Sequence, residues 1–114
     1  MFRNFVIVEP DPVVRLDLRS MLTIEYAGCT IVQPPLVEDA VLALENSDHG
    51  TTVIVRGSQL AKERELARAA VTAMDRGCRL VAVGAVKGFD DRAIWVDTPF
   101  STDTMCVALR GCAS

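Results

Sequence analysis

The side chains best suited to chemistry in this sequence follow short apolar runs. Glu9 and Asp11 come directly after the run Phe5–Val8. Arg56 comes directly after Val53–Val55. Carboxylates are ligands for hard divalent cations, whereas a guanidinium stays protonated and pairs with carboxylates. The sequence therefore offers either a weak metal site or an ion pair, if the fold brings these residues together.

Other kinds of chemical site find no support. The four cysteines show no C-x-x-C spacing, and the one histidine, His49, lies in the polar stretch 46–50. A zinc site and a Cys/His or Ser/His/Asp set therefore cannot be assembled. No glycine-rich dinucleotide fingerprint and no phosphate-binding P-loop follows an apolar run. We expect no enzyme activity and no cofactor.

Composition limits the class of protein further. Half of the 114 residues are hydrophobic, and 12 basic against 15 acidic residues give a net charge of −3. This predicts one domain over residues 1–114 that folds without disulfides or metal. There is no basic surplus to indicate nucleic acid, no 18-residue apolar run to span a membrane, and no signal-peptide pattern. We expect a soluble, cytoplasmic protein.

Apolar runs alternate with segments of helical periodicity. We predict strands at Phe5–Val8, Thr30–Val32, Val53–Val55, Leu80–Val83 and Ile94–Val96. We predict helices at Pro12–Tyr26, Val37–Asn46, Gln59–Arg76 and Asp103–Gly111. This alternation predicts a three-layer α/β domain, doubly wound around a five-stranded parallel sheet of flavodoxin-like order 2-1-3-4-5. Only ten residues, 84–93, join the last two strands, so the fourth helix should be short or missing.

In such a sheet, ligands bind beyond the carboxyl ends of the strands. Four segments are predicted there: Glu9-Pro10-Asp11, Arg56-Gly57-Ser58, Gly84-Ala85 and Thr98-Pro99-Phe100. Two of them carry a recognisable pattern. The stretch from Val6 to Leu16, VIVEPDPVVRL, and the turn TPFS from Thr98 to Ser101 resemble the matching parts of response-regulator receiver domains. The resemblance extends from Phe5 to about Cys112 and implies the receiver fold and bacterial two-component (phosphorelay) signalling.

The resemblance does not extend to receiver chemistry. Receivers phosphorylate an Asp after the third strand, bind a divalent metal with that Asp and an acidic pair, and use a Thr or Ser and a Lys near the phosphoryl group. Of the matching positions here, only the first keeps its group: Glu9, Pro10, Arg56, Gly84 and Thr98. Together with Asp11 they form a degenerate pocket. The resemblance thus implies a stand-alone pseudo-receiver, with no phosphoacceptor and with Mg²⁺ binding lost or weak.

Arg56 could replace the metal in this pocket. One interpretation is that it pairs with Glu9, Asp11 or both, and the other is that it points into solvent. If the domain does accept phosphate by atypical chemistry, Ser58 and Asp97 are the residues to consider. Ser58 is better explained as the cap of the third helix. A further alternative is a small-molecule sensor that uses the vacated pocket.

A module without phosphorylation must act through contacts with other proteins. The resemblance implies a histidine kinase or another signalling protein as partner, or a homodimer, and no nucleic acid or membrane. The short fourth crossover should expose Phe89 and Trp95, and with Phe100 these are the candidate contact residues. Trp95 could instead cover the core, or do both in a dimer. Receivers also imply a cis peptide bond before Pro99.

Overall fold

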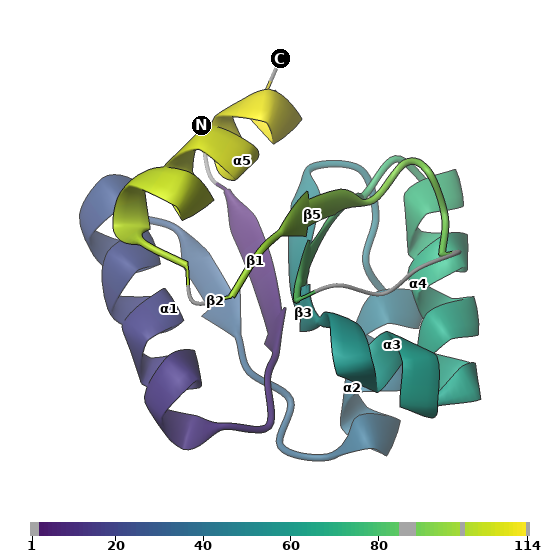
Figure 1. The fold of residues 1–114 in the computed structure, drawn as a ribbon. Helices are drawn as coiled ribbons and strands as arrows, with labels where there is room; N and C mark the ends of the chain where they lie inside the picture. Colours follow the sequence, from purple (N-terminus) through teal and green to yellow (C-terminus); the bar gives the residue numbers. More distant parts are fainter. Residues whose placement is uncertain (1–2, 85–88, 99, 114) are drawn as a thin grey trace.

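The architecture was examined in a computed structural model, which describes residues 3–84, 89–98 and 100–113. Five parallel strands form one sheet in the order β2-β1-β3-β4-β5 (Figure 1). The strand order predicted from the sequence is confirmed. The strands are β1 (Asn4–Val8), β2 (Thr30–Val32), β3 (Thr51–Arg56), β4 (Arg79–Val83) and β5 (Ile94–Val96).

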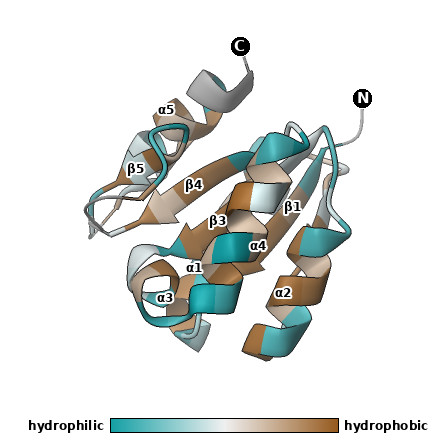
Figure 2. Cartoon of the chain, turned by 90° about the vertical axis from the view of Figure 1, so that its right-hand side faces the viewer, coloured by the Kyte–Doolittle hydropathy of each residue, from teal (hydrophilic) through white to brown (hydrophobic). Residues whose placement is uncertain are grey.

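Helices cover both faces of the sheet, which gives the expected three layers. Helices α1 and α5 lie on one face, and α2, α3 and α4 lie on the other (Figure 1). Figure 2 shows α2 and α4 side by side in front of the sheet, with hydrophobic residues along the strands behind them. The helices are α1 (Pro12–Glu25), α2 (Val37–Glu45), α3 (Gly57–Lys62), α4 (Arg64–Asp75) and α5 (Thr102–Ala113).

Side-chain alternation along the strands builds two cores. Phe5 and Ile7 of β1 point toward α1 and α5, whereas Val6 and Val8 point toward α2 and α4. Central strands are buried on both faces, so they need the continuous apolar runs that are typical of parallel sheets. The edge strands β2 and β5 have only three residues each and are partly exposed. The sheet therefore fixes β1 and β3 most firmly, and their carboxyl ends carry the site.

The third helix differs from the prediction. The segment expected as one helix, Gln59–Arg76, is two helices, because Glu63 between them is extended, with φ −106° and ψ 100°. Leu60 and Leu66 both belong to the same core. At about 100° per residue, side chains six positions apart lie roughly 120° apart around a straight helix, so one continuous helix would not point Leu60 and Leu66 in the same direction. The break at Glu63 lets both leucines reach the core.

The fourth crossover has no helix in its described residues, 84 and 89–93. The guanidinium of Arg92 instead holds this segment, since it contacts Asp75 at the end of α4 at 2.8 Å and Asp90 at 2.7 Å. Phe89 packs against the core below. The peptide bond before Pro99 lies outside the described residues, so its predicted cis form stays a prediction. Within the described ranges, no helix combines the length and apolar character that a membrane span requires.

Candidate functional site

Strand register brings Glu9 and Arg56 together. Strands β1 and β3 pair in parallel with Val8 beside Val55, so the next residue on each strand, Glu9 and Arg56, extends the same row. Both follow apolar residues that lock the strand ends into the core. Glu9 is itself buried, with a side chain that is only 2% exposed. A carboxylate in such a place requires a partner, because burial of an unpaired charge is costly.

Arg56 is that partner. Its Nε donates to Glu9 Oε1 at 2.7 Å, and its Nη2 lies 2.6 Å from the same oxygen. The other oxygen, Oε2, accepts the backbone N–H of Asp11 at 2.9 Å. Both carboxylate oxygens are therefore engaged by groups of the chain. Of the interpretations of Arg56 stated above, pairing with Glu9 is confirmed and orientation into solvent is wrong.

Asp11 takes a different role from the one considered for it. Its Oδ1 accepts the N–H of Val13 at 2.9 Å, which makes it the N-cap of α1 ahead of Pro12. Its side chain is exposed and forms no ion pair with Arg56. Pro10, between the two acidic residues, is exposed and contributes no donor or ligand atom from its side chain. The two carboxylates thus have different roles: Glu9 pairs with Arg56, and Asp11 caps α1.

Gly84 and Thr98 follow the neighbouring strands β4 and β5 at the same edge of the sheet. A Cβ built on Gly84 would lie 4.0 Å from the Thr98 methyl group, so the two positions are neighbours. Gly84 has φ +90°, in the region that favours glycine, and its N–H donates to the carbonyl of Val96 at 2.8 Å. There is space for a side chain here, but the backbone conformation disfavours one. Thr98 is exposed.

The residues of this pocket do not fit a divalent cation. Mg²⁺ requires several oxygen ligands in near-octahedral geometry, commonly with one or two carboxylates. Among the described residues of the pocket, Glu9 has the one buried carboxylate, and it already accepts from Arg56 and from the Asp11 backbone. A cation in its place would lie against the Arg56 guanidinium, at a repulsion of about 4 kcal/mol for unit charges 4 Å apart at an effective dielectric of 20. Arg56 thus provides the positive charge that Glu9 needs.

The two alternative acceptors, Ser58 and Asp97, are both exposed residues. Ser58 was expected to cap the third helix, and this is wrong: α3 begins at Gly57, its N-cap is Arg56, and no side chain caps it. Ser58 lies within the helix and is exposed, as is Asp97 after β5. Helix α3 starts directly at the end of β3, so the capping position falls two residues earlier than the pattern suggested.

Sequence reasoning missed the part that Arg15 plays. Its Nη1 lies 3.4 Å from the backbone carbonyl of Glu9, so α1 reaches back to the pocket rim. Arg15 also lines a small cleft of about 180 Å³ beside the pocket, together with Glu9 and Gln59. The i, i+6 spacing of Glu9 and Arg15 across a helix N-terminus is no recognisable signal, because only the direction of α1 brings them together.

The candidate contact residues divide into covered and exposed groups. Phe89 and Phe100 are half-buried and pack against the two cores, one on each face of the sheet. Trp95 is 37% exposed and meets the Phe89 ring edge-on, with ring centroids 6.3 Å apart. Phe89 therefore covers the core below the short crossover, while Trp95 remains accessible. Beside it lies an apolar depression between β5 and α5, lined by Ile94, Trp95, Val96, Thr104, Val107 and Ala108.

Solved structures of receiver domains superpose on this chain. A response regulator receiver domain from Bacillus halodurans C-125 superposes with a TM-score of 0.77 at 13% identity, over 98% of this chain and 97% of that one. The receiver domain of a sensor histidine kinase from Pseudomonas aeruginosa PAO1, which holds a magnesium ion in its active site cleft, gives 0.70 at 16%, over 100% of both chains. A CheY-like receiver domain from Methanospirillum hungatei JF-1 gives 0.71 at 16%, over 96% and 94%.

No protein-family model matches the sequence, and no curated protein matches it. At identities of 13% and 16%, the structural likeness concerns the fold. The chain has the five-stranded fold of response-regulator receiver domains along almost its whole length. Sequence motifs at two strand ends were sufficient to identify that likeness.

Proposed function

We propose that this chain is a pseudo-receiver, a cytoplasmic protein–protein interaction module of bacterial two-component signalling that works without phosphorylation. It requires no metal or cofactor, and it is not an enzyme. The observation that carries the proposal is the ion pair of Arg56 with Glu9, 2.6 Å apart, at the strand ends where receivers hold their metal and phosphoryl group. An internal cation there replaces an exchangeable one.

The chemistry of the pocket supports this proposal. An acyl phosphate needs a carboxylate nucleophile, and a guanidinium cannot supply one. Phosphoryl transfer further needs cationic groups aimed at the transferred oxygens. Arg56 is already neutralised by Glu9, and the positions after the neighbouring strands β4 and β5 are Gly84 and Thr98. The Pseudomonas aeruginosa receiver domain holds magnesium in its cleft, whereas in this pocket both oxygens of Glu9 are engaged.

Phosphorylation is tested by incubating the protein with acetyl phosphate and Mg²⁺ and measuring its intact mass. We expect no gain of a phosphoryl group in the wild type. The control is a receiver domain with an intact acidic site, treated in parallel. A gain of one phosphoryl group that hydroxylamine removes would overturn the proposal in favour of a phosphorylatable receiver with atypical chemistry.

The depression between β5 and α5 is the surface that we propose for a signalling partner such as a histidine kinase. It is apolar, it includes the accessible ring of Trp95, and Val107 beside it is 63% exposed. Tryptophan is among the residues that contribute most to binding energy at interfaces. An affinity experiment from the native cell should retain a two-component protein on the wild type and lose it on Val107→Glu. Retention of that protein by both forms would contradict this assignment.

A small-molecule sensor is the weaker reading of the same pocket. The cleft beside Glu9 is about 180 Å³, whereas ligand sites commonly measure roughly 300–1,000 Å³. A thermal-shift screen against nucleotides and common metabolites separates the two readings. We expect no ligand to raise the melting temperature, and a saturable rise that Arg56→Met abolishes would favour the sensor.

A further inference from the structure

One guanidinium ties the fourth crossover to helix α4. The Nε and Nη2 atoms of Arg92 donate to the two oxygens of Asp90, at 2.9 and 2.7 Å, and the backbone N–H of Arg92 donates to Asp90 Oδ1 at 2.9 Å. Its remaining nitrogen, Nη1, donates at 2.8 Å to Oδ1 of Asp75, the last residue of α4. All three nitrogens of the guanidinium are therefore engaged. We call the set Asp75, Asp90 and Arg92 the clasp.

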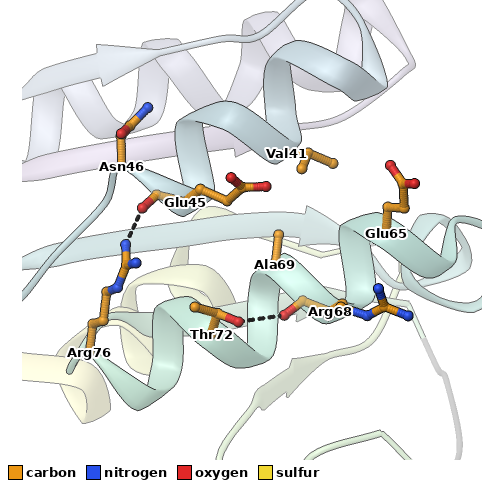
Figure 3. A pocket seen from close by; sticks show the side chains of 8 residues that line it. All are labelled: Val41, Glu45, Asn46, Glu65, Arg68, Ala69, Thr72 and Arg76. Atoms are coloured by element: carbon orange, nitrogen blue, oxygen red, sulfur yellow. Dashed lines mark hydrogen bonds between the residues drawn. The ribbon is translucent and has the colours of Figure 1, made fainter.

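The end of α4 is itself held in place. Arg76, which lines the open groove between α2 and α4, donates a hydrogen bond to the carbonyl of Glu45 at the end of α2 (Figure 3). The chain then turns into β4, where the N–H of Cys78 donates to the carbonyl of Ala73 and its thiol lies 3.1 Å from the carbonyl of Asp48. The clasp thus joins the crossover to a part of the molecule that other contacts already fix.

On the crossover side, the clasp lies next to Phe89. Phe89 directly precedes Asp90, and the carbonyl of Asp90 accepts the N–H of Ala93 at 3.1 Å, which closes a turn. Ala93 is buried in the core beneath α2 and α4, and Phe89 packs against the same core. A pair of parallel contacts between arginine and a carboxylate fixes geometry more firmly than one contact does. The clasp therefore gives this turn, and with it the Phe89 ring, a defined place.

Phe89 in turn lies against Trp95. Trp95 pairs with Ala82 across β5 and β4, and Ala82 belongs to the core beneath α2 and α4. The indole therefore projects from the sheet on the side where Phe89 packs. The two rings meet edge-on, with centroids 6.3 Å apart, and 37% of Trp95 remains exposed. Phe89 is thus one of the groups that cover the indole.

We propose that Arg92 is a positioning residue for the partner surface at the depression between β5 and α5. It holds Phe89 against Trp95 through the turn 89–93, and so fixes the indole that lines this depression. A surface whose side chains are already fixed loses less freedom when a partner binds, so it binds more tightly. The inference rests on the proposed function, because it names a residue that controls the surface assigned there.

The single tryptophan makes the inference testable on the isolated chain. Acrylamide quenching of Trp95 fluorescence measures access to the indole, and Phe89→Ala gives the value for an indole without its covering ring. Arg92→Gln should raise the quenching constant of the wild type toward that value. Asp75→Asn should raise it too, because it frees the turn from α4. The control is Asp91→Asn, which changes an exposed neighbouring carboxylate outside the clasp and should leave the constant unchanged.

A double variant tests whether Arg92 acts through Phe89. The quenching constant of Arg92→Gln/Phe89→Ala should equal that of Phe89→Ala alone. The side chains of Arg92 and Asp75 are 47% and 62% exposed, so variants at these positions should keep the fold. Equal quenching in the wild type, Arg92→Gln and Asp75→Asn would overturn the proposal. A further rise in the double variant would also overturn it, because Arg92 would then act on Trp95 by another route.

Binding of the partner provides the second readout. A two-component protein that the wild type retains from the native cell should bind Arg92→Gln and Asp75→Asn about threefold to fivefold more weakly, and Asp91→Asn as tightly as the wild type. Unchanged binding by the two clasp variants would overturn the role of Arg92 at the partner surface. If the wild type retains no such protein, the proposed function fails and the partner surface with it, whereas quenching still decides whether Arg92 positions Trp95.

Discussion

Both Nε and Nη2 of Arg56 contact the same oxygen of Glu9, Oε1, at 2.7 and 2.6 Å. The other oxygen, Oε2, accepts the backbone N–H of Asp11. The pair is uneven in exposure, because the Glu9 side chain is 2% exposed and that of Arg56 is 24% exposed. Loss of the cation therefore leaves a buried charge, whereas loss of the carboxylate leaves a cation that can still reach water.

Removal of Arg56 should destabilise the protein strongly. Arg56→Met leaves the Glu9 carboxylate buried without its cationic partner, and we expect a loss of about 2–4 kcal/mol in the free energy of unfolding. Urea denaturation measures this loss. In the double variant Glu9→Gln/Arg56→Met the buried charge is gone, so its loss should be smaller than that of Arg56→Met alone. The single variant Glu9→Gln completes the cycle. If the stability losses of Glu9→Gln and Arg56→Met simply add in the double variant, the two residues are not coupled.

Replacement of Arg56 by a carboxylate should create a response to divalent cations. In the wild type, Mg²⁺ should leave the melting temperature unchanged at constant ionic strength. In Arg56→Asp, two carboxylates share the pocket, and Mg²⁺ should raise the melting temperature because it relieves their repulsion. Arg56→Asn is the matched control, with the same size and no charge, and it should not respond. A Mg²⁺ response in the wild type would contradict the reading of Arg56 as the resident cation.

Asp90 gives the fourth crossover a dependence on acid. Hydrogen bonds from Arg92 lower the pKa of Asp90 from 3.8 to about 2. A group whose pKa is lower in the folded state stabilises that state above its unfolded pKa, and the contribution disappears as pH falls from about 4 to about 2. Asp90→Asn should therefore have a lower melting temperature than the wild type at neutral pH, and the difference between the two melting temperatures should shrink as pH approaches about 2. The neighbouring Asp91→Asn should show no such pattern.

The buried thiols should react slowly with alkylating agents. Burial raises the pKa of the Cys78 thiol, and it raises that of Cys106 in the same way. Because the thiolate is the reactive form, both residues should be labelled by iodoacetamide more slowly than half-buried Cys29, with peptide mass mapping as the measurement. Addition of urea should bring the three rates together. Fast labelling of Cys78 in the native protein would point to a reactive cysteine instead.

Much of the fold was evident from local patterns. Continuous apolar runs indicated buried parallel strands, and β2 and β5 have the predicted bounds, Thr30–Val32 and Ile94–Val96. Asp11 followed by Pro12 indicated the start of α1, and Asp11 is its N-cap. These signals depend on steric and hydrogen-bonding preferences within a few residues, so they can be recognised without the tertiary structure. The break of the third helix at Glu63 could not be predicted in this way, because it depends on which core Leu60 has to reach.

For the site, the sequence determined which functional groups are present, and the tertiary structure decided which of them pair. From the sequence it followed that an arginine stands where receivers have their acceptor and that one acidic residue remains. It left open whether Arg56 meets Glu9, Asp11 or water, since residues 47 positions apart come together only through strand register. Asp11 and Glu9 have the same charge, but the start of α1 takes one for its cap and the strand end buries the other.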